Sequence, residues 1–295
     1  MAKDWFKPID QSWQQSVVQV QSHANWLWVV KHQCGIDDLI DHWIKQKLCH
    51  DHVNAPCGHC PSCLLGLSHP DVLRTGHDDS IGVDAIREGA EVMFRKPTVS
   101  QRRIWILDQR FSMTIAAMNA LLKVLEEPPQ YATIVLMTEQ DHLVLPTLKS
   151  RVSIWRMPDI DNTVSVHQWL CDEHNNTMGI EETTALFYAS GCRPLQVKEW
   201  LLKEVKIPVL TFFNQWLRGN NDVGVFMDFC HDEMMLPLID GFIYLCWQYI
   251  LQGKHLERCH QAYRVAQSIR QEKTSSIVMN TSLLKQRWCH ELTHI

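Results

Sequence analysis

The sequence lacks several features that are typical of particular classes of protein. Its first residues, MAKDWFKPIDQSW, contain no apolar core of a signal peptide, and no later run approaches the roughly 18 apolar residues of a membrane span. A basic excess is missing as well, since the net charge is -5 at pH 7, and a protein that holds duplex DNA alone usually carries a basic face. Internal repeats are absent. We therefore expect a cytoplasmic protein, without a membrane partner, whose 295 residues form two or three domains.

Cysteine, in contrast, is abundant. The chain has 11 cysteines, and four of them lie in the stretch CHDHVNAPCGHCPSC at 49–63. In a reducing compartment an odd number of cysteines argues against a disulfide framework and for metal ligands with buried thiols. Cys57, Cys60 and Cys63 form two overlapping C-x2-C steps, and Cys49 completes a set of four. Four thiolates around one ion give the closed tetrahedral shell of a structural zinc site.

Three other interpretations of this stretch remain open. The three later cysteines have the spacing that begins a bacterial iron–sulfur motif, although no fourth cysteine follows three residues on. A C-x2-C pair can also be a redox centre, but such a pair stands at a strand-to-helix junction, and this one follows an expected helix. Finally, a histidine of the stretch could replace one cysteine as a ligand (His50, His52 or His59).

Strand and helix patterns alternate through the first half of the chain. A continuous apolar run typical of a covered strand occurs at 23–31, and further strand candidates occur at 70–75, 103–107, 132–138 and 152–157. Apolar residues at helical spacing occur between them, at 37–49, 82–94 and 112–129. This alternation predicts an α/β domain with a parallel sheet that is covered on both faces.

Two of these expected helices show which side chains should be buried. In the first, the apolar stripe consists of Val83, Ile86, Ala90 and Met93. In the second, Ser112 is the expected N-cap, and the buried face consists of Ile115, Met118, Leu121, Leu122 and Leu125.

The character of the sequence changes after Met157-Pro158. From there to the end, segments with helical spacing follow one another and no strand pattern occurs. We expect a first domain at 1–158, with the cysteine stretch at 49–63 as a module within it. A small helical domain should follow at 159–207, and an all-helical domain at 208–295.

The turn after the first expected strand lacks the groups that bind nucleotide phosphates. In a P-loop, G-x-x-x-x-G-K-[ST], the lysine reaches the phosphates and the hydroxyl holds magnesium. Here the turn reads KHQCGIDD: Gly35 is kept, but Asp37 and Asp38 stand in place of the lysine and the hydroxyl residue. Carboxylates at a helix N-terminus complement its dipole and repel a triphosphate. Asp108 could still bind magnesium, but Gln109 follows where an ATPase needs a carboxylate. We therefore expect this chain neither to bind ATP nor to hydrolyse it.

The order of these motifs resembles the delta-prime subunits of bacterial DNA polymerase III, in the clamp-loader family of AAA+ proteins. The resemblance rests on the P-loop without lysine, the four-cysteine insert after its helix, and the segments GVDAIRE, AAMNALLKVLEEPP and LPTLKSR, in that order. It covers about residues 20 to 160. It implies a RecA-like AAA+ domain with a zinc-binding insert, then a small helical lid, then an all-α collar domain.

The resemblance also implies a function. Members of the family do not hydrolyse ATP themselves but belong to the DNA polymerase III holoenzyme, a DNA-directed DNA polymerase. They sit in a five-subunit ring with gamma/tau ATPase subunits and a delta subunit, and the ring loads the sliding clamp onto primed DNA. Two rival functions remain, an autonomous AAA+ ATPase with an aberrant P-loop and a zinc-dependent DNA-binding protein. The missing lysine disfavours the first rival, and the acidic net charge disfavours the second.

Site residues follow from the resemblance only where the sequence matches the family. The four cysteines match its zinc ligands (Cys49, Cys57, Cys60 and Cys63). Arg151, in Ser150-Arg151-Val152, matches the arginine of a Ser-Arg-Cys motif that reaches the ATP site of the neighbouring subunit. Val152 departs from that motif, but the guanidinium performs the chemistry of such an arginine finger.

Overall fold

The computed structural model describes residues 4–18, 25–76, 81–108, 113–174, 178–203, 205, 209–219, 235–274 and 281–295. The chain divides into two compact units, Phe6–Pro158 and Asp159–Ile295 with Met1–Trp5. Gln109, the expected cap Ser112 and the expected boundary at 207 all lie outside the described residues. The division into domains at 1–158, 159–207 and 208–295 stays a prediction.

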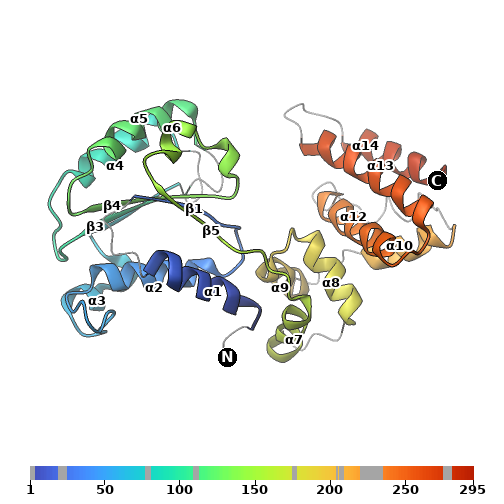
Figure 1. Ribbon diagram of the computed structural model, residues 1–295, viewed down its shortest axis with the longest axis horizontal. Helices are drawn as coiled ribbons and strands as arrows, with labels where there is room; N and C mark the ends of the chain where they lie inside the picture. Colours follow the sequence, from blue (N-terminus) through green and yellow to red (C-terminus); the bar gives the residue numbers. More distant parts are fainter. Residues whose placement is uncertain are drawn as a thin grey trace. The chain divides into compact units, whose positions relative to one another are not determined.

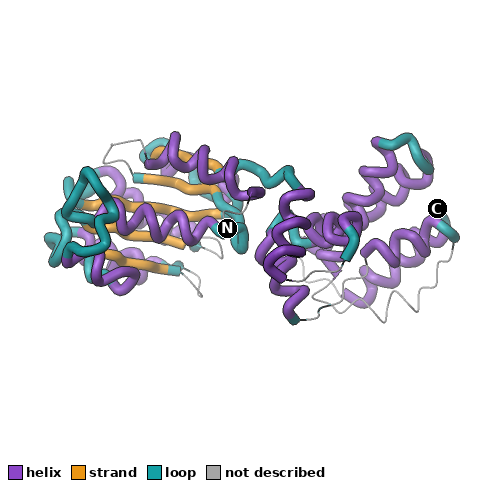
Figure 2. The backbone as a smooth tube through the Cα atoms, turned by 90° about the horizontal axis from the view of Figure 1, so that it is seen from below, coloured by secondary structure: helices purple, strands orange, loops and turns teal. Residues whose placement is uncertain are grey.

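The unit Phe6–Pro158 is built on a five-stranded sheet in the order β2-β3-β4-β1-β5 (Figures 1 and 2). All four pairs of neighbouring strands are parallel. The strands are β1 Trp26–Val29, β2 Val72–Thr75, β3 Arg103–Asp108, β4 Ala132–Thr138 and β5 Ser153–Arg156. Each lies within or overlaps a run predicted from the sequence, so the predicted parallel α/β sheet is confirmed.

Helices cover both faces of this sheet, with α4, α5 and α6 on one face and α1 and α2 on the other (Figure 1). The α-helices of the unit are α1 Lys7–Trp13, α2 Ile36–Leu48, α3 Pro61–Leu65, α4 Val83–Met93, α5 Ile115–Glu126 and α6 Pro146–Lys149. Shorter helical turns are η1 Asp4–Phe6, η2 Gln14–Val18, η3 Gly66–Ser68 and η4 Asp141–Leu143. Helix α1 lies outside the elements predicted from the sequence, because its seven residues are too few to show a helical period.

The buried face of α5 differs from the predicted one at its first residue. Ile115 is 67% exposed. The helix begins at this residue, after Thr114, whose hydroxyl accepts a hydrogen bond from the backbone N–H of Ala117 at 3.1 Å. A side chain at the first helical position has no preceding turn beneath it, so it projects away from the core. The buried residues of α5 are Ala117, Met118, Leu121, Val124 and Leu125, and Leu122 is half-buried.

Helix α4 lies beside α5 on the same face of the sheet and packs closely on the sheet at Gly89. Ile86 and Met93 are buried as predicted, whereas Val83 and Ala90 are half-buried. A Cβ atom at Gly89 would lie 2.1 Å from the ring of Trp105 in β3. Glycine at this position therefore lets the helix backbone rest directly on the indole.

Four tryptophans form the core between the sheet and helices α1 and α2. Trp13 of α1 meets Trp28 of β1 at a ring-centroid distance of 4.8 Å and Trp155 of β5 at 4.9 Å. Trp28 in turn meets Trp43 of α2 at 5.1 Å, and all three contacts are edge-to-face. Such pairs contribute about 0.5–1.5 kcal/mol each beyond the area they bury. The N-terminal helix is thus part of the core of this unit.

The described residues of the second unit contain helices and no strand, as the sequence predicted. Its helices are α7 Thr163–His174, α8 Ile180–Ala189, α9 Pro194–Leu202, α10 Val209–Leu217, α12 Met235–Leu251, α13 Leu256–Thr274 and α14 Thr281–Thr293. Phe242 of α12 contacts the rings of Phe213, Trp216 and Trp288, all of them buried. Trp5, from the start of the chain, meets Trp169 of α7 at 5.5 Å. Among the described residues, no helix is long and apolar enough to cross a membrane.

Candidate functional site

The four predicted cysteines come together at one end of the sheet unit. Cys49 is the residue that ends α2, and Cys60 is the N-cap of α3, whose first turn contains Cys63. Cys57 lies in the loop between them. Pro61 at the first helical position of α3 suits this short helix, because proline has no backbone N–H to leave unpaired there. The helix therefore places two of the four sulfurs one turn apart.

The sulfur atoms of the four cysteines lie within 4.8 Å of one another. The Sγ–Sγ distances from Cys49 to Cys60 and from Cys57 to Cys63 are both 4.0 Å. The backbone N–H groups of Cys57, Cys60 and Cys63 each donate to the sulfur of another cysteine of the set at 3.4 Å. Hydrogen bonds, that of the His50 backbone N–H first among them, lower the pKa of Cys60 to about 6, whereas burial raises the pKa of Cys63 to about 12.

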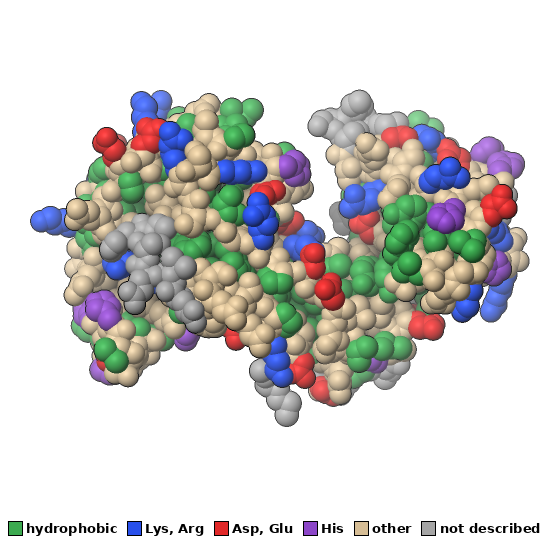
Figure 3. All heavy atoms as spheres, in the orientation of Figure 1, with side chains coloured by type: hydrophobic (Ala, Val, Ile, Leu, Met, Phe, Trp, Pro, Cys, Tyr) green, Lys and Arg blue, Asp and Glu red, His purple; other side chains and the backbone are tan. Residues whose placement is uncertain are grey.

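This arrangement fits a metal ion. A tetrahedral ion with metal–sulfur bonds of about 2.3 Å separates its sulfurs by roughly 3.8 Å, close to the distances found. The N–H groups that point at the sulfurs would further stabilise thiolates. The histidines of the loop are exposed rather than turned into the cluster (His50, His52 and His59). Figure 3 shows histidine and hydrophobic side chains on the surface at this end of the molecule. The four cysteines can thus hold a metal ion without a histidine ligand.

A buried hydrogen-bond chain connects the cysteine module to the sheet. Ser62, between two of the cysteines, contacts His69 at an Oγ–Nε2 distance of 2.8 Å. The Nδ1 atom of His69 accepts from the backbone N–H of Asp71 at 3.0 Å, so Nε2 carries the ring proton and donates it to Ser62. A histidine that activates a serine as a general base must accept a hydrogen bond from the serine hydroxyl. Here His69 donates to Ser62 instead. The Ser62, His69 and Asp71 set is therefore structural.

Asp71 is the centre of a larger network. Its side chain is fully buried and accepts from the backbone N–H groups of residues 98–100 at 2.6–2.9 Å. The guanidinium of Arg103 lies 3.1 Å from it and also donates to backbone carbonyls of Val92 and Lys96. Burial alone would raise the pKa of Asp71, but the backbone N–H groups outweigh it, so the pKa lies below its usual value.

The degenerate nucleotide turn follows β1. Gly35 adopts a left-handed conformation, with φ of 72°, and is the N-cap of α2. Asp37 and Asp38 occupy the first turn of that helix and are exposed. The backbone N–H of His32 donates to the carboxylate of Glu139 at 2.6 Å. A backbone N–H of this turn is thus bonded to a carboxylate of the chain itself, at the edge of the sheet where P-loops bind phosphate.

Asp108 and Glu139 end neighbouring strands at that same edge. Asp108 is the last residue of β3 and is buried, and Glu139 directly follows β4. Because β4 lies between β3 and β1, both carboxyl groups are placed at the carboxyl ends of the strands around the degenerate turn. Three acidic residues, Asp37, Asp38 and Glu139, therefore border the position of a nucleotide phosphate.

Arg151 lies in the turn between α6 and β5, and its side chain is 34% exposed. Its Nη2 atom is 2.7 Å from Oε1 of Glu126, the last residue of α5. Its Nη1 atom donates to the carbonyl oxygen of Thr147 at 2.7 Å and to the hydroxyl of Ser150 at 3.2 Å. The guanidinium is therefore held in one orientation at the surface of its own chain.

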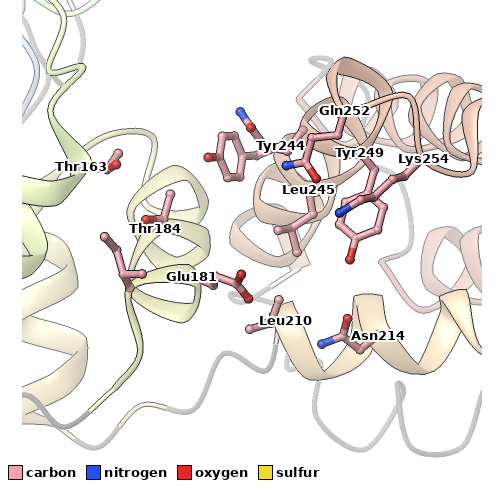
Figure 4. A pocket seen from close by; sticks show the side chains of 12 residues that line it. Thr163, Glu181, Thr184, Leu210, Asn214, Tyr244, Leu245, Tyr249, Gln252 and Lys254 are labelled. Atoms are coloured by element: carbon pink, nitrogen blue, oxygen red, sulfur yellow. The ribbon is translucent and has the colours of Figure 1, made fainter.

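A pocket of about 310 Å³ opens in the helical unit (Figure 4). Glu181 of α8 stands on one side of it, and Tyr249 and Lys254 stand on the other, with Asn214 of α10 below them. None of the site residues predicted from the sequence lines this pocket. The four cysteines and Arg151 belong to the other unit.

Three contacts around these residues were not predicted: Glu139 to the turn after β1, Glu126 to Arg151, and Asp71 to the loop at 98–100. A signal existed for the first of them. Glu139 directly follows a predicted strand, and carboxyl ends of parallel strands meet at the ligand-binding edge of such a sheet.

A family model described as DNA polymerase III, delta subunit, matches residues 7–161, just over half of the chain. The chain belongs to this family. Its sequence is similar to those of delta-prime clamp-loader subunits of DNA polymerase III, as the sequence motifs predicted. The family relationship covers the sheet unit, which carries the cysteines, the degenerate turn and Arg151.

Individual members of the clamp-loader group support this assignment. The delta-prime subunit of Haemophilus influenzae is 29% identical over 201 residues, 67% of this chain and 61% of that protein. The delta-prime subunit of Escherichia coli K12 is 36% identical over 124 residues, 40% of this chain and 37% of that protein. The gamma/tau subunit of Mycobacterium tuberculosis H37Rv is 39% identical over 100 residues, 32% of this chain and 17% of that protein. The chain thus spans less than two thirds of the length of these relatives.

Proposed function

We propose that this delta-prime-like chain is a non-hydrolysing, cytoplasmic subunit of a clamp loader. It joins gamma/tau-type ATPase subunits and a delta subunit in a ring, and the ring loads a sliding clamp onto primed DNA. The observation that carries the proposal is the degenerate turn. There Asp37 and Asp38 replace phosphate-binding groups, and Glu139 accepts a hydrogen bond from the backbone N–H of His32. A subunit without its own ATP chemistry acts through its neighbours.

Within that ring we assign Arg151 as an arginine finger. It is an exposed arginine at the end of α6 whose own nucleotide turn is acidic, so the anion that it can serve belongs to another chain. The contact with Glu126 is a surface ion pair, and such pairs are worth about 0–1 kcal/mol, which an approaching phosphate can exceed. Reconstitution with gamma/tau and delta subunits tests the proposal: the chain should enter a stable complex and be required for clamp loading onto primed DNA.

The metal in the cysteine module should be zinc. Four thiolates with no open coordination position are the ligand set of structural zinc, and their binding energy would order a loop that has few apolar residues. Elemental analysis of the purified chain should find about one zinc per molecule and no iron. Cys60→Ser should abolish zinc binding, whereas Cys171→Ser, outside the module, should retain it.

The sheet should survive the loss of zinc in Cys60→Ser. The module reaches the sheet through Ser62 and His69, but the other partners of Asp71 lie outside the module. Circular dichroism should therefore retain most of the α/β signal. If the protein is brown and absorbs visible light after anaerobic purification, the module holds an iron–sulfur cluster and the zinc prediction is wrong.

The isolated chain should not bind ATP. Asp37, Asp38 and Glu139 place negative charge around the position of the phosphates, and Asp37 stands where a P-loop has its lysine. Titration calorimetry should therefore give no heat of binding when Mg-ATP is added to the chain at micromolar nucleotide concentrations. Micromolar binding, or ATP hydrolysis by the chain alone, would favour the rival function of an autonomous ATPase.

A further inference from the structure

Helix α5 ends in two consecutive glutamates with different surroundings. The carboxylate of Glu126 lies 2.7 Å from Nη2 of Arg151. Glu127, the next residue, is also exposed and has no ion pair or hydrogen bond among the described residues. The chain thus offers a matched pair of acidic side chains, of which only one touches the proposed finger.

The guanidinium of Arg151 is held on two sides. Nη1 meets the carbonyl oxygen of Thr147 and the hydroxyl of Ser150, which itself donates to that carbonyl at 2.9 Å. These contacts fix the end of the side chain to the last turn of α6. Glu126 adds a contact from α5, a different element, so the direction of the guanidinium plane depends on it.

This arrangement leaves the arginine able to bind an anion. A guanidinium has five N–H groups, and three of them make the contacts described. The other two have no acceptor among the described residues, which suffices for a pair of hydrogen bonds to phosphate oxygens. Glu126 therefore does not have to release Arg151 before the arginine can contact a nucleotide of a neighbouring subunit.

We infer that Glu126 is a positioning residue that orients Arg151 toward the ATP site of the neighbouring subunit. The inference rests on the proposed function and assigns an acidic partner to its finger. Orientation matters because an arginine finger contributes only where its donors already point at the charge of the transition state. A long side chain that is free to rotate must be ordered during each catalytic cycle, and the Glu126 contact removes part of this cost.

The test uses the reconstituted complex and measures the DNA- and clamp-stimulated ATPase of the subunit that faces Arg151. Glu126→Gln should lower kcat about two- to fivefold, the range of one exposed ion pair, with KM for ATP unchanged. Glu127→Gln, which removes the same charge one residue away, should leave kcat unchanged. Glu126→Asp, one methylene shorter, should behave like Glu126→Gln, because its carboxylate does not reach Nη2.

The decisive comparison is made in an Arg151→Ala background. There Glu126→Gln should cause no further loss, because a positioning residue acts only through the side chain that it positions. Equal rates for the Glu126 and Glu127 variants, or a further loss in the Arg151→Ala background, would overturn the positioning role while leaving the finger intact. A higher rate in Glu126→Gln would overturn it as well, because the carboxylate would then oppose the finger. If Arg151→Ala itself has no effect, the proposed function fails and not only this inference.

Discussion

Arg151→Ala should nearly abolish clamp loading while leaving the complex assembled. Arginine fingers contribute on the order of 10³ to 10⁵ in rate, about 4 to 7 kcal/mol of barrier, where they are the main stabiliser of the transferring phosphoryl group. Only the ATP site that faces this subunit should lose that contribution. Total ATPase should therefore fall only partially, because the other ATP sites of the proposed ring would keep their own fingers, whereas clamp loading should fall sharply.

The chemistry of the side chain supplies the control for this experiment. Arg151→Lys should restore little activity, because an ammonium lacks the planar fork that meets two phosphate oxygens at once. Folding should be unaffected in both variants, since the side chain is exposed and its ion pair with Glu126 is worth little. If the alanine variant loads clamps at the wild-type rate, Arg151 is not an arginine finger and forms only an ordinary surface ion pair.

Asp71→Ala should destabilise the sheet unit by about 3–5 kcal/mol. The substitution leaves the guanidinium of Arg103 buried without its counter-ion and removes the acceptor of three backbone N–H groups at 98–100. Hydrogen exchange of the amides in β2 and β3 measures the opening of this region directly. Asp84→Ala is the matched control, because its carboxylate is 89% exposed beside Arg87 and should change stability by less than about 0.5 kcal/mol.

The pH dependence of stability should separate these two variants as well. Because the folded pKa of Asp71 lies below the usual 3.8, its stabilising effect is complete above that value and is lost as the pH falls through the folded pKa. The wild-type protein and Asp84→Ala should lose this increment on acidification, and Asp71→Ala should not. Equal stability of the wild type and Asp71→Ala at neutral pH would mean that the network is dispensable.

Elements whose signal is local could be predicted from the sequence. Strand β4 is buried along its whole length and is almost entirely apolar, and β3 is buried as well, with four apolar residues between Arg103 and Asp108. The cysteine set could be predicted because three of its four members are spaced only three residues apart. The order of the strands and the short helix α1 carry no such signal and became visible only in the structure.

Contacts between distant segments could not be predicted in this way. His32 and Glu139 are 107 residues apart, and they meet only because β4 is the neighbour of β1. Glu126 and Arg151 meet where α5 and α6 end on the same face of the sheet. The wrong assignment of Ile115 has a related cause, because helical spacing gives the direction of a side chain but not the residue at which the helix leaves the core.

The bond between Glu139 and the backbone N–H of His32 has a consequence for how such a subunit responds to the energy state of the cell. In an ATPase the backbone N–H groups of this turn bind the phosphates of the nucleotide. Here a carboxylate of the same chain accepts the hydrogen bond of one such N–H. If the loop holds no nucleotide, its shape is independent of the ratio of ATP to ADP, and the subunit can serve its moving neighbours as a stationary reference.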